Sequence, residues 1–184
     1  MDNIERDYYI KEVENKTITK IIFCVSKNIP LNQEIINEIE KSKCRIIEFG
    51  IKFNQPICDY LPPRIEKIIF NEKFNKFNQR VDNLPTFNPE KGENGLKKIT
   101  FGYHFNQPVD NLPSGLQRLT FGCNFNQPVD NLPSGLQRLT FGYEFNQPLN
   151  NLPSGLQKLI ISDTYNKPLN NLPASVKITR IKYY

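Results

Sequence analysis

Apolar and polar residues alternate over short stretches that recur along the chain. One stretch reads Arg118, Leu119, Thr120, Phe121, so its apolar side chains occupy every second position. Alternation with a period of two is typical of a β-strand that buries one face. Gly122 follows and breaks or bends such a strand. The pattern therefore predicts a short strand whose leucine and phenylalanine point inward.

The residues after this strand predict a return path outside the sheet. Phe125 is large and apolar, and residues 126–128 (NQP) follow it. Proline cannot donate a hydrogen bond to a strand ladder, so we expect the chain to leave the sheet there. Residues 132–135 (LPSG) predict a tight turn with proline at its first central position. Leu136 then begins the next unit.

This unit recurs at a fixed period. Phe101, Phe121 and Phe141 are spaced evenly at twenty residues. The same position is held, at equal or wider spacing, by Phe23, Phe49, Phe70, Ile161 and Ile181. A fixed period of this length is typical of a solenoid. The pattern predicts about eight rungs (one rung being one strand with its return path), and the polar insertion 86–94 predicts a surface loop on one of them.

Stacking of the units predicts the core. One unit has a single apolar face and cannot bury it alone, whereas stacked units form a continuous core. Equivalent strands that each return by another path pair in parallel, about 4.8 Å apart. The fold class is therefore mainly β, with one parallel sheet. The predicted core residues form two columns, namely Phe101, Phe121 and Phe141, and Phe105, Phe125 and Phe145.

The recurring text resembles a known repeat. The motif Phe-Asn-Gln-Pro or a close variant begins at Phe53, Phe77, Phe105, Phe125, Phe145 and Tyr165. The pattern Leu-Pro-x-x-Leu-x-x-Leu-x-Phe-Gly follows it, for example from residue 112. Over roughly residues 44–184 the chain resembles the FNIP repeat, a relative of the leucine-rich repeat that is found mainly in amoebae and their large DNA viruses. The resemblance implies a leucine-rich-repeat-like solenoid with a binding role and no catalytic residue.

The first residues depart from the repeat. Residues 1–17 fit no unit, and an N-terminal cap and a flexible tail are the alternatives. We expect the solenoid over residues 18–184. Its first rung, residues 18–43, is divergent, because Leu31, Ile35, Ile36 and Ile39 have helical spacing and predict a short helix over residues 31–41.

Composition excludes several classes of protein. The chain has 184 residues, of which 23% are charged and 38% hydrophobic, so one globular domain is expected. No apolar run approaches a membrane span and no signal peptide begins the chain, so we expect an intracellular protein, in the cytoplasm (of the host cell if viral). The four cysteines lack CxxC spacing and there is one histidine. We therefore expect free thiols, no metal and no cofactor.

Cations form the first candidate binding feature. The position before the inward leucine or isoleucine is held by Lys67, Lys98, Arg118, Arg138 and Lys158. Arg180 is nearly in line. One cation per rung predicts a positive strip for an acidic protein surface or a nucleic-acid backbone. A solvated face without a ligand is the alternative. Tyr103 and Tyr143 are the aromatic candidates beside the strip.

An asparagine follows the aromatic residue of each motif. These residues are Asn54, Asn78, Asn106, Asn126, Asn146 and Asn166. We expect their amides to stack and to satisfy backbone groups at a corner of the rung. A carbohydrate or nucleotide site built from them is the alternative.

Nothing in the sequence predicts catalysis. Ser114, Ser134 and Ser154 recur in a turn without a histidine partner, and His104 stands alone. The glycines are dispersed, so no phosphate-binding loop is expected. The sequence predicts a non-catalytic scaffold that binds a protein of unknown identity through a rigid sheet face, with no membrane partner. A nucleic-acid-binding accessory protein is the alternative.

Overall fold

The structure is a computed structural model of the chain. It describes residues 9–14, 17–23, 28, 30–57, 61–71, 75–86, 90 and 95–182. Within these residues the chain forms one helix, α1 (Gln33–Ser42), and nine strands. The strands are β1 (Tyr9–Glu14), β2 (Thr17–Phe23), β3 (Ile46–Phe49), β4 (Lys67–Phe70), β5 (Lys98–Thr100), β6 (Arg118–Thr120), β7 (Arg138–Thr140), β8 (Lys158–Ser162) and β9 (Lys177–Ile181).

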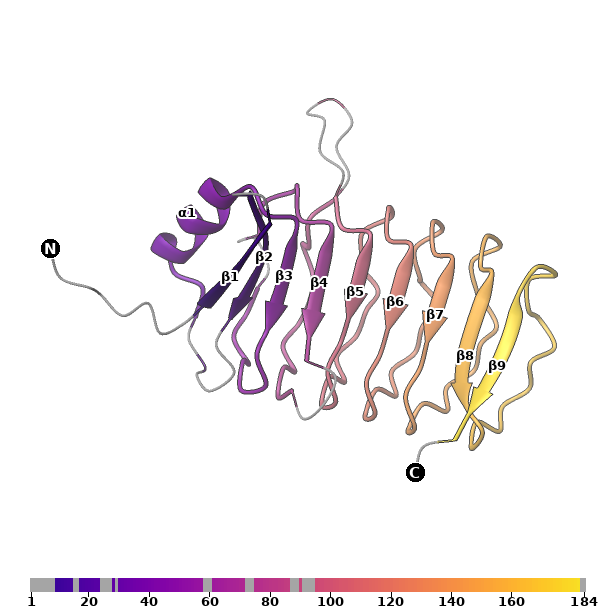
Figure 1. Cartoon of the computed structure of the whole chain (residues 1–184). Helices are drawn as coiled ribbons and strands as arrows, with labels where there is room; N and C mark the ends of the chain where they lie inside the picture. Colours follow the sequence, from indigo (N-terminus) through magenta and orange to yellow (C-terminus); the bar gives the residue numbers. More distant parts are fainter. Residues whose placement is uncertain are drawn as a thin grey trace, which may run out of the picture.

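All nine strands belong to one sheet and lie in it in chain order (Figure 1). Strands β2 to β9 pair in parallel, and each pairing joins equivalent positions of successive rungs. Leu119 of β6, for example, pairs with Ile99 of β5 and Leu139 of β7. This arrangement confirms a leucine-rich-repeat-like solenoid with one parallel sheet and about eight rungs.

The N-terminal edge of this sheet carries a strand that the period did not predict. Residues 9–14, within the segment for which a cap and a tail were alternatives, form β1 and pair antiparallel with β2. The backbone of β1 therefore covers the outer edge of β2. Residues 1–8 lie outside the described part of the chain.

Helix α1 lies at the N-terminal end, before β3 (Figure 1). It runs over residues 33–42, whereas the spacing predicted residues 31–41. The helix starts later because the Asn32 side chain caps it, accepting a hydrogen bond from the Ile35 amide at 2.9 Å. It ends at Ser42, and the C-cap residue Lys43 has a left-handed φ of 57°. Its buried residues, Ile35, Ile36 and Ile39, form one apolar face.

Two columns of phenylalanine rings fill the centre of the solenoid. Phe101, Phe121 and Phe141 follow the strands, and the centroids of neighbouring rings are 5.6 and 5.5 Å apart. The second column, Phe105, Phe125 and Phe145, has centroid distances of 6.0 and 6.1 Å. All six rings are buried. The two columns contact each other within each rung, as between Phe121 and Phe125 at 3.7 Å.

The last rung corrects the register expected from the period. Ile181 does not continue the column of Ile161, because β8 and β9 pair Ile161 with Arg180. The final unit is one residue shorter before its strand: Lys177 directly follows Val176, whereas Gln157 separates the equivalent residues of β8. Every residue of β9 is therefore displaced by one position relative to the expected spacing.

This displacement brings a cation to the end of the core column. The Arg180 guanidinium donates hydrogen bonds to the carbonyl oxygens of Tyr165 at 2.9 Å and Ser162 at 3.4 Å. Ile178 pairs with the buried Leu159, and its own side chain is 42% exposed. Arg180 thus follows Ile161 in the column of the rings and is held there by hydrogen bonds to the preceding rung.

Candidate functional site

The sheet brings the five predicted cations together in one row. The pairing register joins Lys67 to Lys98, Lys98 to Arg118, Arg118 to Arg138, and Arg138 to Lys158. The row continues to Lys177 of β9 and not to Arg180. We call these six residues, one from each of β4 to β9, the cation row. The regular spacing did not predict that Lys177 belongs to this row, because the last unit is one residue shorter before its strand.

The alternation of each strand turns the cation row away from the core. Arg118 and Arg138 are exposed, and each precedes a leucine that is at most 1% exposed. Lys158 and Lys177 are also exposed, whereas Lys67 and Lys98 are half-buried. Stacked strands lie about 4.8 Å apart, so the row from Lys98 to Lys177 spans about 19 Å over its four steps.

A row of threonines, interrupted by Ile160, lies beside the cation row. It contains Thr100, Thr120 and Thr140, which pair with one another, followed by Ile160 and Thr179. A shallow groove runs along the two rows from β5 to β8, with Lys98, Arg118, Arg138 and Lys158 among its lining residues. A second hollow continues it at β9, where Lys177 joins. The long cations rise above the groove because the threonines are short.

The charge of this face is uneven along the solenoid. At the N-terminal end, carboxylates contact the cations: Lys20 pairs with Glu48 at 2.7 Å, and Glu66 pairs with Arg45 at 2.6 Å and Lys97 at 3.9 Å. The strands β5 to β9 contain no aspartate or glutamate. The charged residues within the strands β5 to β9 are therefore all lysines and arginines.

The two tyrosines expected beside the strip lie elsewhere. Tyr103 and Tyr143 follow the strands in turns, and among the described residues that line the groove neither appears. Tyr143 is 40% exposed, and Cys123 occupies the rung between the two. The hydrogen bond with Cys123 raises the pKa of Tyr103. These rings therefore form no continuous stacking platform along the cations.

The asparagines form a hydrogen-bonded ladder. From Asn54 to Asn146, each side-chain Oδ1 accepts a bond from the backbone amide of the next asparagine, as from Asn78 to Asn54 at 2.9 Å and from Asn146 to Asn126 at 3.0 Å. All six asparagines take part. A glutamine of the same motif also donates to the Oδ1, as Gln127 does to Asn106 at 3.1 Å. The ladder thus provides hydrogen-bond acceptors for backbone N–H groups at the point where the chain has left the sheet.

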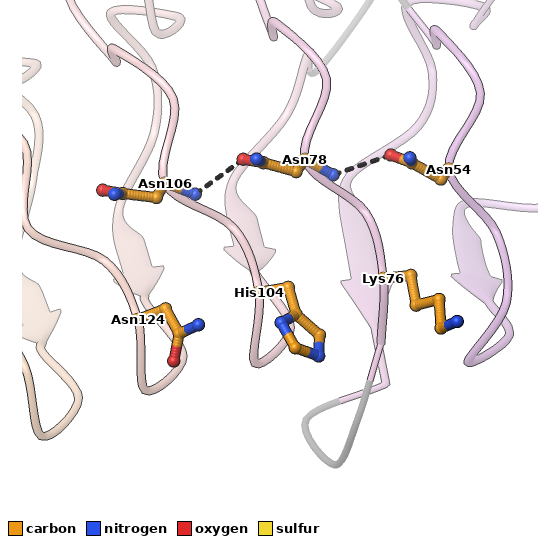
Figure 2. A pocket seen from close by; sticks show the side chains of 6 residues that line it. All are labelled: Asn54, Lys76, Asn78, His104, Asn106 and Asn124. Atoms are coloured by element: carbon orange, nitrogen blue, oxygen red, sulfur yellow. Dashed lines mark hydrogen bonds between the residues drawn. The ribbon is translucent and has the colours of Figure 1, made fainter.

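A shallow pocket lies beside this ladder (Figure 2). Asn54, Asn78 and Asn106 line one side of it, and Lys76, His104 and Asn124 line the other. Figure 2 shows the two groups as separate rows that do not converge on one point. The Oδ1 atoms of Asn54 and Asn78 already accept the ladder bonds. The pocket is therefore an open surface between two columns.

Thiols and metal ligands are sparse in the described part of the chain. Cys44 is buried and free, and burial raises the pKa of its thiol. Cys123 is half-buried and also free, while Cys24 and Cys58 lie outside the described residues. Among the described residues, no group of three or more His, Cys, Asp or Glu side chains is placed to hold a metal ion.

The parallel one-sheet stack with its ring columns defines a leucine-rich-repeat-like repeat protein. The family model of the FNIP repeat matches residues 77–124, 108–143, 125–151 and 145–181, which together make up more than half of the chain. The chain belongs to the FNIP repeat family. No curated protein matches it. None of the helices in the described residues has the length and apolar character needed to cross a membrane.

One solved structure is similar to the chain along most of its length. It is described as the crystal structure of CroV588, a novel circular LRR protein. The two are 31% identical with a TM-score of 0.49, and the match covers 94% of this chain and 31% of the other. This chain thus spans about a third of the length of that protein.

Proposed function

We propose that this chain is a non-catalytic scaffold that binds a protein partner with an acidic surface through its cation row. The observation that carries the proposal is the register itself. Six residues of one sign, from six successive strands, lie next to one another on the outer face of the sheet.

Such a row opposes the stability of the fold. Two like charges held 5 Å apart in water repel by roughly 0.8 kcal/mol before salt screening. The row contains both lysine and arginine, so its sign is kept where the residue type changes, for example from Arg138 to Lys158. An arrangement that destabilises the free protein and keeps its sign over six strands is well suited to an acidic partner, which relieves the repulsion on binding.

Catalysis receives no support from the geometry. Ser114, Ser134 and Ser154 are exposed residues of turns. His104 is exposed, and its ring contacts Tyr103 edge-on with centroids 5.0 Å apart. Features that repeat in every rung are explained by stacking, whereas an active site needs different groups that converge on one place.

The test inverts the charge at the centre of the row. We expect Arg118→Glu with Arg138→Glu to remain folded by circular dichroism and to lose more than about tenfold in affinity for an acidic partner at low salt. The matched control is Lys76→Glu with Lys167→Glu, which changes the net charge equally at two exposed positions outside the row. The partner is captured with the parent protein from a lysate of the cells in which the protein occurs, and its affinity is then measured with all three proteins.

Two results would overturn the proposal. Equal weakening by both double variants would show that net charge, and not the row, governs binding. A captured partner that binds the Arg118→Glu, Arg138→Glu protein as tightly as the parent would show that the row is a solvated face. A nucleic-acid function would be indicated instead if generic duplex DNA bound the parent with a steep negative salt slope that the row variant loses.

A further inference from the structure

We infer that the partner's binding element is an α-helix with acidic residues at positions i, i+4, i+7, i+11 and i+14, lying along the cation row from β5 to β9. This inference rests on the proposed function, since it specifies the partner of the same face. It is carried by the spacing, the shape and the charge distribution of the row.

The spacing matches one turn of a helix. The five cations Lys98, Arg118, Arg138, Lys158 and Lys177 cover about 19 Å, in steps of about 4.8 Å. Fourteen residues of α-helix rise about 21 Å, and a side chain returns to the same face every three or four residues. Five acidic residues of a single helix face therefore meet five rungs with a misfit of about 2 Å, which the flexible stems of lysine and arginine absorb.

Other acidic ligands fit the row less well. An extended strand laid along the row repeats on one face about every 6.7 Å, so four steps cover about 27 Å and run past the row. A B-DNA strand advances about 3.4 Å per phosphate and winds around its axis, so few of its phosphates stay over a straight row. The row thus favours a partner by the spacing of its acidic groups as well as by its negative charge.

The groove runs in the direction that the helix would take. Thr120 and Thr140 lie beside the cations as short, half-buried side chains, and the groove runs along both rows over four strands. A surface helix is about 10–12 Å across, so its backbone can lie over the threonines while its acidic face turns toward the cations. The hydroxyl groups of the threonines can accept hydrogen bonds from, or donate them to, polar side chains at the edge of the helix.

The charge distribution sets the extent of the site. Glu48 and Glu66 contact cations at the N-terminal end of the face, so an acidic helix would meet carboxylates there. From β5 onward the strands carry no acidic residue. We therefore place the helix over β5 to β9, centred on Arg138.

Two peptides of identical composition test the inference. Both contain five glutamates among alanine and glutamine; one has them at i, i+4, i+7, i+11 and i+14, and the other has them at every second position. Fluorescence anisotropy at low salt measures the affinity of each for the parent protein. We expect the helix-patterned peptide to bind at least about tenfold more tightly, and its helicity by circular dichroism to rise on binding.

The variants distinguish binding of a helix from binding of any acidic partner. We expect Arg118→Glu with Arg138→Glu to abolish the preference, and Lys76→Glu with Lys167→Glu to keep it. Equal affinities of the two peptides for the parent, both lost in the row variant, would overturn the helix while the acidic-partner function stands. If neither peptide bound the parent more tightly than the row variant, the row would not be an acid-binding site, and both proposals would fail.

Discussion

Replacing Phe121 with alanine removes a ring from the middle of the core. Phe121 is 3% exposed, and its ring contacts Phe125 within the rung at 3.7 Å and Phe101 and Phe141 in the neighbouring rungs at 5.6 and 5.5 Å. Loss of the buried side chain costs about 1.5–3 kcal/mol in transfer free energy. The rungs on either side are held by strand pairing and cannot collapse into the space, so a cavity term adds to the loss. We expect the free energy of unfolding to fall by about 3–5 kcal/mol.

Chemical denaturation followed by circular dichroism measures this loss. The control is Arg118→Ala, three residues away in sequence on the opposite face of the same rung, for which we expect less than about 0.5 kcal/mol. Comparable losses for Phe121→Ala and Arg118→Ala would refute the assignment of inward and outward faces. A loss below about 1 kcal/mol for Phe121→Ala would mean that the rungs repack independently, contrary to a continuous core.

Three further predictions test the contacts between rungs and the burial of a thiol. Asn126→Ala leaves the Asn146 amide without its acceptor and should lower the free energy of unfolding by about 1–3 kcal/mol, whereas Asn126→Asp keeps an acceptor and should cost less. Gly122→Ala places a Cβ against the Gly102 carbonyl and should destabilise by about 1–3 kcal/mol, whereas Gly155→Ala, whose Cβ lies 3.8 Å from the Ser134 carbonyl, should not. In a Cys24→Ser, Cys58→Ser background, a thiol reagent at pH 8 should modify Cys44 at least about tenfold more slowly than Cys123, because burial disfavours its thiolate; equal rates would contradict the buried placement.

The regular part of the fold could be predicted from the sequence because every rung obeys the same constraints. Residues 118–121 specify a strand with one apolar face, and the equal spacing of Phe101, Phe121 and Phe141 leaves parallel stacking in one register as the way to bury it. The helix was predictable from the spacing of Ile35 and Ile39, and its start shifted because Asn32 serves as the N-cap.

The departures from regularity could not be predicted from the period. Strand β1 has no counterpart in other rungs, so the period does not indicate it. Its strand conformation depends on antiparallel pairing with the edge of β2. The register of β9 depends on a single missing residue after Val176, which moves Lys177 into the cation row and Arg180 to the end of the core column. The glutamine of the motif was visible in every unit but the last, where Lys167 replaces it. Its bond to the asparagine of the preceding unit is a contact between rungs, which depends on the stacking geometry.

Some columns of equivalent residues stabilise the stack of rungs, whereas one column does not, and this difference guides the functional proposal. The rings gain contacts from their equivalents in the next rung, the asparagines satisfy the next backbone amide, and Gly122 and Gly142 allow the turns to approach closely. Each of these columns therefore needs no ligand to explain it. The cation row is the opposite case, because every added lysine or arginine repels its neighbour. Stacking explains where its residues lie but not why they share a sign, and this is the reason for proposing a partner that supplies negative charge.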